Sequence, residues 1–401
     1  MWRLLREVRP DSPAAAAVAV VLFSLHPYLL ADKWIRNANA EFAAYALLPG
    51  LLVGAVAGEP RRRFWWTSIC LALVILSHNI VALVAITLVL AIALFVHRNL
   101  RAMIPVACGV LAALATTAFF WLPAMLLQPL IRPEELLTGK LDFRGQFPHL
   151  AAFVWPSEFY SGGWLTPILA LFLVFAAVSN TKARRIARAF GAATLACLFL
   201  MLPLSTWVWE ILPLLRFAQF PWRFMGALAV LLATGAALAW PSSLRVHWRV
   251  AVPIAVLLVA VLNAIPAMRQ HELIAPEFAG RLEPALRPDG IQSKDLRTTV
   301  GDEYLPRGAN LSEVKPIDGV RLFKRWAFPV WTAQRRGEAL PTESGPGGVV
   351  AVRIGSEADD VVLSLREPPV RRITKWFSGA AVALLVFIAA AERFRRPQTV
   401  A

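Results

Sequence analysis

The chain has 401 residues, of which 58% are hydrophobic and only 17% are charged, and its mean hydropathy is +0.57. Since about half of a soluble globular protein is apolar, this composition excludes an ordinary soluble domain and indicates a polytopic membrane protein. The formal net charge is +15, but acidic and basic side chains nearly balance within residues 269–372. Almost all the excess therefore lies in the apolar remainder and its short loops, where it orients the chain in a membrane. We expect membrane lipid as a partner and no nucleic acid.

About ten segments are long and apolar enough to cross a bilayer, which takes roughly 20 residues. The segments are 14–30, 42–58, 64–78, 80–96, 103–127, 165–179, 190–206, 224–240, 250–268 and 373–390. The third and fourth form one apolar run that only Ser77, His78 and Asn79 interrupt. The chain is therefore expected to be mainly α-helical, a transmembrane bundle of about ten helices.

The loops sort by charge. "RLLREVR", "EPRRR", "HRNLR", "NTKARRIAR", "SSLRVHWR" and "ERFRR" are basic and fall on one side of the predicted bundle. Because positively charged loops stay in the cytoplasm, we expect both termini to be cytoplasmic. The N-terminal segment has no small-residue cleavage site, which predicts a retained first helix.

The expected extracytoplasmic loops include a domain at residues 269–372. Its first half is rich in Pro, Gly and charge, whereas "GVRLFKRWAFPVW", "GGVVAVRIG" and "DDVVLSLREP" alternate as short strands do. We predict a small β-rich, sandwich-like domain between the multi-span region 1–268 and a final helix with a basic tail, 373–401.

Common catalytic motifs are absent from the sequence: it has no phosphate-binding or dinucleotide-binding glycine motif, no HExxH and no serine nucleophile elbow. The three cysteines lie in apolar runs, so neither a disulfide framework nor a thiolate metal site is expected. The polar residues that stand out lie in the expected external loops.

The first loop, "HPYLLADKWIRNANAEF", carries Asp32, Arg36 and Glu41 between two spans. Ionisable groups at membrane depth often mark a functional site, although Asp32 and Arg36 at i, i+4 could simply form an ion pair.

In "LSHN", a neutral His78 beside Asn79 could act as a general base or bind a ligand. The alternative is a turn that satisfies its own backbone.

A third group is "RFAQFPWRF", which places two arginines on the side expected to be poor in them. Guanidinium groups suit phosphate, so Arg216 and Arg223, with Gln219 beside them, could hold a lipid phosphate. The alternative is an aromatic belt with snorkelling arginines and Glu210 as their partner.

The loop at 128–164 could form a groove for the acceptor. Its charged candidates are Asp142, Arg144, His149 and Glu158, and Trp155, Tyr160 and Trp164 could stack on sugar rings. The loop could equally be an amphipathic cap.

In "GDEYLPRG", Asp302 and Glu303 beside Tyr304 could bind a divalent cation, although two acids are a weak signal.

Six ordered pieces carry a family resemblance: "PYLLADKWIRNANAEFAAYALLP", "LALVILSHNIVALVAI", "AFFWLPAM", "LDFRGQFPHLAAFVWP", "LRFAQFPWRFM" and "DEYLP". Together they resemble bacterial polytopic membrane proteins labelled as 6-pyruvoyl-tetrahydropterin synthase-related. The chain has no histidine cluster for zinc and no pterin or nucleotide motif, so the label's chemistry is not expected here. That family is similar to the GT-C glycosyltransferases, which transfer sugar from a polyprenyl-phosphate carrier on the outer face of the membrane.

The resemblance implies a GT-C-like transferase, whose acidic residue in the first external loop activates the acceptor or holds a metal. By this analogy Asp32, Glu41 and His78 would be catalytic. Arg36, Asn79, Asp142, Arg144, Arg216, Gln219, Arg223 and Tyr304 would bind substrate. The first loop of this chain is similar to a later loop of the family, so its usual opening helices are expected to be missing. The alternatives are a non-catalytic protein that scaffolds or transports envelope glycolipid or polymer, and a fragment without a function of its own.

Overall fold

The computed structural model groups the chain into two compact units, Met1–Thr117 with Asp142–Arg281, and Ala118–Leu141 with Leu282–Ala401. The domain boundaries expected from the sequence, 1–268, 269–372 and 373–401, remain a prediction that this division into two units does not test. The residues that the structure describes are 1–153, 163, 165–178, 184–240, 254–262, 264–265, 306–310, 313, 317–354 and 360–394.

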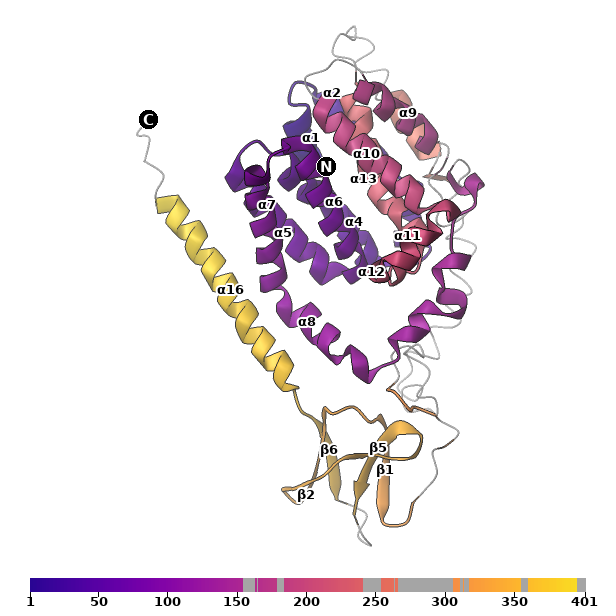
Figure 1. Ribbon diagram of the computed structural model, residues 1–401, viewed down its shortest axis with the longest axis vertical. Coiled ribbons are helices and arrows are strands. Elements are labelled where there is room, and N and C mark those ends of the chain that lie inside the picture. The colour runs from indigo at the N-terminus through magenta and orange to yellow at the C-terminus, as the bar shows by residue number, and fades with distance from the viewer. Residues whose placement is uncertain are drawn as a thin grey trace. The chain divides into compact units, whose positions relative to one another are not determined.

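The described part of the first unit is helical (Figure 1). Prolines stand in the first turn of several of its helices, where a missing N–H is tolerated and the fixed φ suits a helix. The helices are α1 (Trp2–Val8), α2 (Pro13–Ser24), α3 (Pro27–Trp34), α4 (Asn39–Val56), α5 (Pro60–Ser77), α6 (Asn79–His97), α7 (Leu100–Thr116), α9 (Leu165–Val178), α10 (Arg184–Leu200), α11 (Thr206–Ile211), α12 (Pro213–Arg216) and α13 (Phe224–Leu238). The 3₁₀ turns are η4 (Phe143–Gly145), η5 (Leu150–Phe153), η6 (Pro203–Ser205) and η7 (Pro221–Arg223).

Two breaks in these helices matter for the site. The expected span 14–30 is two helices, α2 and α3, which meet at 43° next to Pro27. The apolar run from 64 to 96 breaks at His78, whose side chain accepts a hydrogen bond from the N–H of Val81 and caps α6. Both breaks place polar side chains at helix ends.

Four helical segments in the described residues are long and apolar enough to cross a membrane: Asn39–Val56, Asn79–His97, Pro221–Leu238 and Pro369–Arg393. The number rises to seven if each of three bent helix pairs is one span. Several apolar helices are thus consistent with a membrane protein, whereas a bundle of about ten spans is not confirmed. The expected span 250–268 lies only partly within the described residues.

Helix α13 forms the core of the first unit, where it packs against α2, α9 and α10. All its residues except Ala236 are buried. Small residues bring helices close together, as is common between membrane helices. A Cβ added at Gly226 would overlap the ring of Tyr45 on α4, and one added at Gly235 would meet Leu173 on α9.

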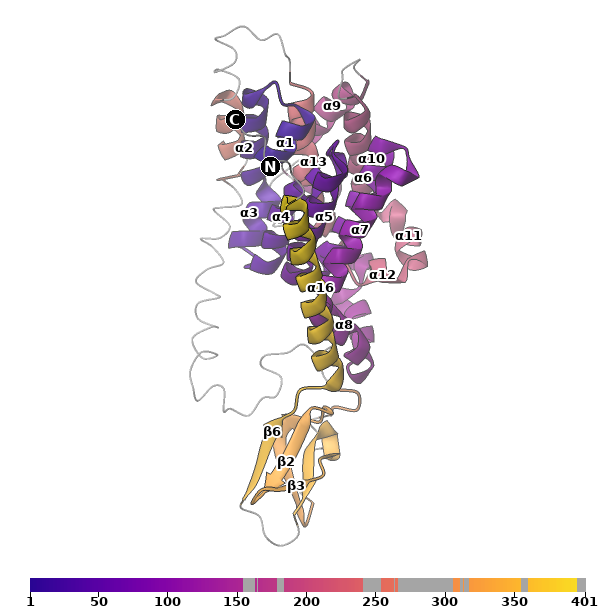
Figure 2. The ribbon, with the colours of Figure 1, turned by 90° about the vertical axis from the view of Figure 1, so that its left-hand side faces the viewer.

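The described part of the second unit contains two helices, three short 3₁₀ turns near α8 and a small strand region (Figure 2). Helix α8 (Ala118–Leu127) packs along α16 (Pro369–Phe394), where the Ser378 hydroxyl accepts a hydrogen bond from the Phe119 N–H at 3.0 Å. The turns are η1 (Gln128–Leu130), η2 (Pro133–Leu137) and η3 (Gly139–Leu141). Helix α16 leaves large apolar side chains exposed, including Trp376 at 77%, as a lipid-facing helix would.

The strands form two antiparallel three-stranded sheets, ordered β1-β5-β4 and β3-β2-β6. Val352 of one sheet is buried with Ala333 and Val361 of the other, so the sheets pack face to face. The expected strand region near the C-terminus is confirmed. The strands are β1 (Val320–Trp326), β2 (Trp331–Arg335), β3 (Glu338–Leu340), β4 (Glu343–Ser344), β5 (Val349–Arg353) and β6 (Val361–Leu365), and η10 (Pro346–Gly348) precedes β5.

We expect Gly226→Ala to destabilise the first unit by about 1–3 kcal/mol, because the new methyl group has no room beside the Tyr45 ring. The control is Gly191→Ala on α10, whose added Cβ would meet only Ala177 at 3.9 Å and should be neutral or stabilising. Thermal unfolding of the purified protein in detergent measures both. Equal melting temperatures for the two variants would contradict this packing.

Candidate functional site

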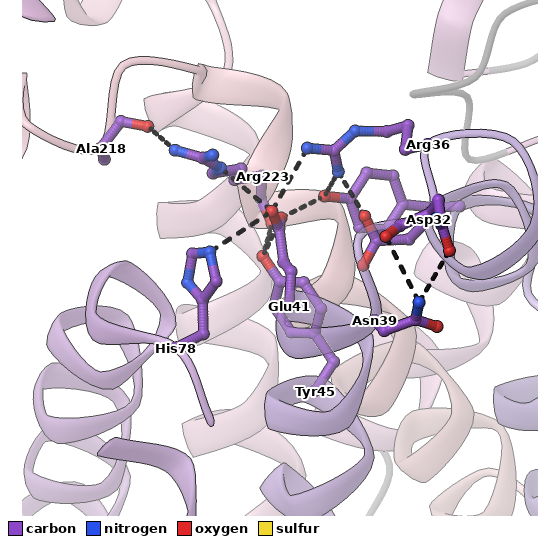
Figure 3. A network of polar contacts seen from close by, with 10 residues as sticks. Asp32, Arg36, Asn39, Glu41, Tyr45, His78, Ala218 and Arg223 are labelled. Atoms are coloured by element: carbon purple, nitrogen blue, oxygen red, sulfur yellow. Dashed lines mark hydrogen bonds and ion pairs between the residues drawn. The ribbon is translucent and has the colours of Figure 1, made fainter. Parts of the chain in front are cut away.

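A buried polar cluster lies where α3, α4 and the start of α13 meet (Figure 3). Helix α3 carries Tyr28 and Asp32 one turn apart, and α4 carries Glu41 and Tyr45 with the same spacing, so each pair shares a helix face. The chain reverses between the two helices at Asn37, which adopts a positive φ of 51°. This turn brings the two polar faces together.

Glu41 is the centre of the cluster, and its side chain is only 2% exposed. Its Oε1 accepts a hydrogen bond from the Tyr28 hydroxyl at 2.8 Å, and its Oε2 lies 3.3 Å from both Arg36 Nη2 and Arg223 Nε. The Tyr45 hydroxyl lies 3.3 Å from Oε1 but 2.6 Å from the carbonyl oxygen of Arg223. Since the hydroxyl has one proton, the shorter contact is the donated hydrogen bond. Both oxygens of Glu41 are thus engaged.

The two guanidinium groups of the cluster each rest on an aromatic ring. Arg36 lies 4.5 Å from the centroid of Trp222, and Arg223 lies 4.7 Å from that of Phe220. These two rings stack on each other at 4.8 Å. Cation–π contacts of this kind gain strength when they are desolvated.

The cluster is balanced in charge. Arg36 bridges the two acids, because its Nη1 pairs with Asp32 Oδ1 while its Nη2 pairs with Glu41. Arg223 adds an ion pair to Glu41 and donates from Nη1 to the Ala218 carbonyl oxygen at 2.7 Å. Two acidic side chains therefore face two guanidinium groups, which is how charge is normally tolerated inside a protein.

Asp32 differs from Glu41 in one respect. Its side chain is fully buried, and its Oδ2 is without a hydrogen-bond donor among the residues that the structure describes. Buried carboxylate oxygens are normally hydrogen-bonded, so an orphaned one needs an explanation. A ligand hydroxyl group that entered the interior of the cluster could use this acceptor.

His78 joins the cluster from the turn between α5 and α6, with Nε2 3.8 Å from Glu41 Oε2. Its Nδ1 accepts the Val81 N–H at 3.3 Å, so Nδ1 carries no proton and the proton of the neutral ring is on Nε2. The protonated Nε2 therefore faces Glu41 from beyond hydrogen-bond distance, and the general-base role that the sequence suggested for His78 stays a prediction.

The predicted phosphate site is not brought together in the way we expected. Arg216 donates to the carbonyl oxygens of Trp209 and Glu210 at the end of α11, whereas Arg223 lies in the cluster. The Glu210 carboxylate instead pairs with Arg144 at 2.7 Å. The two arginines therefore have different partners, and Arg216 acts as a cation at a helix C-terminus.

The other site residues predicted from the sequence lie in different elements of the fold or outside the described residues. Gln219 is buried in a left-handed conformation, with a φ of 61°, in the turn before Arg223. Asn79 is exposed at the first residue of α6. Arg144 pairs with Asp142 as well as with Glu210, and His149 is exposed, so these residues do not join the contacts of the cluster. Trp155, Glu158, Tyr160, Trp164, Asp302, Glu303 and Tyr304 lie outside the described residues.

Metal binding does not fit the cluster. Within the described ranges, no group of three His, Cys, Asp or Glu side chains could hold a metal ion. Arg36 already lies against both carboxylates, and a divalent cation would have to displace it. Any divalent cation at residues 302–304 lies outside the described part of the chain.

The sequence-based reasoning missed four residues of the cluster: Tyr28, Tyr45, Phe220 and Trp222. The tyrosines could have been found, because Tyr28 precedes Asp32 by four residues and Tyr45 follows Glu41 by four. No local signal indicates that Phe220 and Trp222 would support guanidinium groups from η7 and from the α3–α4 loop.

We expect Glu41→Ala to lower the stability by about 3–5 kcal/mol, because it leaves Arg36 and Arg223 buried with too few acidic partners. Glu41→Gln keeps the shape and should cost less. The matched control, Glu210→Ala, removes an exposed carboxylate and should cost at most about 1 kcal/mol. Melting temperatures in detergent compare the three, and similar values for Glu41→Ala and Glu210→Ala would contradict a central role for Glu41.

Comparisons with known proteins do not assign the chain to a family. No protein-family model matches it, and neither a curated protein nor a solved structure is found to be similar. The resemblance that the sequence carries therefore stays a prediction.

Proposed function

We propose that this protein is an integral membrane transferase, related to the GT-C enzymes, which moves a sugar from a polyprenyl-phosphate carrier to an acceptor hydroxyl group. The observation that carries the proposal is the buried Asp32 Oδ2, a carboxylate oxygen without a donor among the described residues. In this proposal the chain forms a bundle of about ten spans, acts on the outer face of the bacterial cytoplasmic membrane, and keeps both termini in the cytoplasm.

Asp32 is the better candidate for the general base than Glu41. Both oxygens of Glu41 are held by Tyr28, Arg36 and Arg223, so Glu41 would have to break hydrogen bonds before it could accept a proton. Oδ2 of Asp32 is free of such bonds in the described structure, while Oδ1 is fixed by Arg36. Oδ1 thus orients the carboxylate through its ion pair with Arg36, and Oδ2 can accept a proton.

In the proposed transfer, one bond to the anomeric carbon of the sugar forms as another breaks. Asp32 Oδ2 takes the proton of the acceptor hydroxyl group, the acceptor oxygen forms a bond to the sugar's anomeric carbon, and the bond from that carbon to the carrier phosphate breaks. The phosphate leaves with the electron pair. Arg36 suits this leaving group because its side chain is 17% exposed, more than those of its partners Asp32 and Glu41, and its guanidinium can donate two parallel hydrogen bonds to phosphate.

A second candidate function is a non-catalytic protein that scaffolds or transports envelope glycolipid or polymer. The balance of two acidic and two guanidinium side chains favours it. A cluster whose charges are paired in this way can have a purely structural role, which is to hold α3, α4 and the start of α13 together. The two candidates differ in what they require of Asp32.

We expect Asp32→Asn to reduce transfer by about 10²–10⁴-fold while the protein still folds, because the amide keeps the shape but cannot take a proton. The assay uses protein in lipid vesicles, radiolabelled polyprenyl-phosphate hexoses and a glycolipid extract as acceptor. Asp11→Asn is the control, since it changes an exposed carboxylate outside the cluster and should leave transfer unchanged.

Two results would contradict the transferase proposal. One is the absence of transfer by the wild-type protein from every carrier hexose tested, together with no binding of these lipids. The other is full complementation of a deletion strain's envelope glycans by Asp32→Asn. The second result supports the non-catalytic candidate.

A further inference from the structure

A cavity of about 550 Å³ lies between the C-terminal end of α6 and the first turns of α10. It is lined by His97, by two aliphatic side chains and by four arginines, Arg98, Arg184, Arg185 and Arg188. The two basic segments that supply these arginines are far apart in the sequence, and the packing of α6 against α10 brings them to one place.

The arginines of this cavity have few partners. Arg188 Nε donates to the Ala177 carbonyl oxygen at 3.1 Å, and Arg185 Nη1 donates to that of Val96 at 3.5 Å. The Arg98 guanidinium lies 5.6 Å from the ring centroid of Phe95. Among the residues that the structure describes, none of the four forms an ion pair with a carboxylate.

This arrangement is the opposite of the Glu41 cluster, where guanidinium groups and acids are equal in number. Four like charges around one cavity repel each other, and a bound anion would relieve that repulsion. Guanidinium groups offer fixed pairs of donors that match phosphate oxygens. Basic residues that only orient a membrane protein need no shared cavity.

Exposed apolar side chains adjoin the lining residues Val96 to Arg98 along the chain, and they indicate the source of the phosphate. Leu94 on α6 is 49% exposed, Phe95 is 36% exposed, and Leu100 at the start of α7 is 79% exposed. Helix α6 is itself one of the four helical segments that could cross a membrane in the described residues. A phosphate held by the arginines would thus have apolar surface next to it, as a lipid headgroup requires and a free anion does not.

We propose that the cavity between α6 and α10 binds the phosphate headgroup of an anionic membrane lipid. Basic pockets between membrane helices on the cytoplasmic side are typical sites for such headgroups, and both segments belong to loops expected on that side. This site is separate from the Glu41 cluster, and the inference does not depend on the proposed transfer reaction.

The test measures lipid binding by the full-length chain in detergent. Melting temperature and lipid retention by native mass spectrometry are followed during titration with phosphatidylglycerol, phosphatidylcholine or inorganic phosphate. We expect phosphatidylglycerol to raise the melting temperature and to be retained, phosphatidylcholine to have no effect, and inorganic phosphate to have little.

The double variant Arg184→Gln/Arg188→Gln should bind phosphatidylglycerol at least about tenfold more weakly. The matched control is Arg6→Gln/Arg101→Gln, which removes the same charge from exposed positions that do not line the cavity and should bind as the wild type does. If the glutamine variant does not fold, Arg184→Lys/Arg188→Lys keeps the charge but loses the paired donors, and it should still weaken binding.

Three outcomes would overturn the inference. Equal weakening in the control pair would show that surface charge alone attracts the lipid. Stabilisation by inorganic phosphate equal to that by phosphatidylglycerol would identify a site for soluble anions. Wild-type affinity in folded cavity variants would leave the arginines as orientation charges only.

Discussion

The burial of the Glu41 carboxylate is the constraint on which the first unit depends. A carboxylate that is 2% exposed must be matched by donors, and those donors come from α3, from the α3–α4 loop and from the start of α13. Gly226 lies three residues after Arg223 and gives the Tyr45 ring the space to reach the Arg223 carbonyl oxygen. The electrostatic requirement and the close packing of α4 against α13 are therefore met at the same place.

The aromatic turn before α13 explains why its two arginines differ. Gln219 adopts a left-handed conformation, after which Phe220 and Trp222 stack and offer their faces to Arg223 and Arg36. Arg216, on the other side of this turn, donates to backbone carbonyl oxygens at the end of α11. One short segment thus directs one cation into the core and leaves the other at a helix terminus, where a positive charge is favourable.

Charge balance separates the two arginine-rich regions of the first unit. In the Glu41 cluster every guanidinium has an acidic partner, so an anionic ligand must compete with Asp32 and Glu41 for Arg36. Around the cavity between α6 and α10 the described residues offer the four arginines no acid, so an anion meets no such competition. Arginine content alone does not distinguish these regions, because the difference lies in which carboxylates the fold brings near.

The sequence by itself determined the apolar helices, the break at His78, the strand region near the C-terminus and the i, i+4 spacing of Asp32 and Arg36, whereas it predicted a single span over 14–30, which the structure breaks next to Pro27. These features follow from apolar length, residue spacing and local backbone chemistry. Only the tertiary structure decided that Arg223 pairs with Glu41, 182 residues away, that Arg216 does not join it, and that the C-terminal end of α6 and the first turns of α10 share a cavity. Such contacts depend on how helices pack against one another, and a local pattern specifies which face of a helix is buried but not which helix covers it.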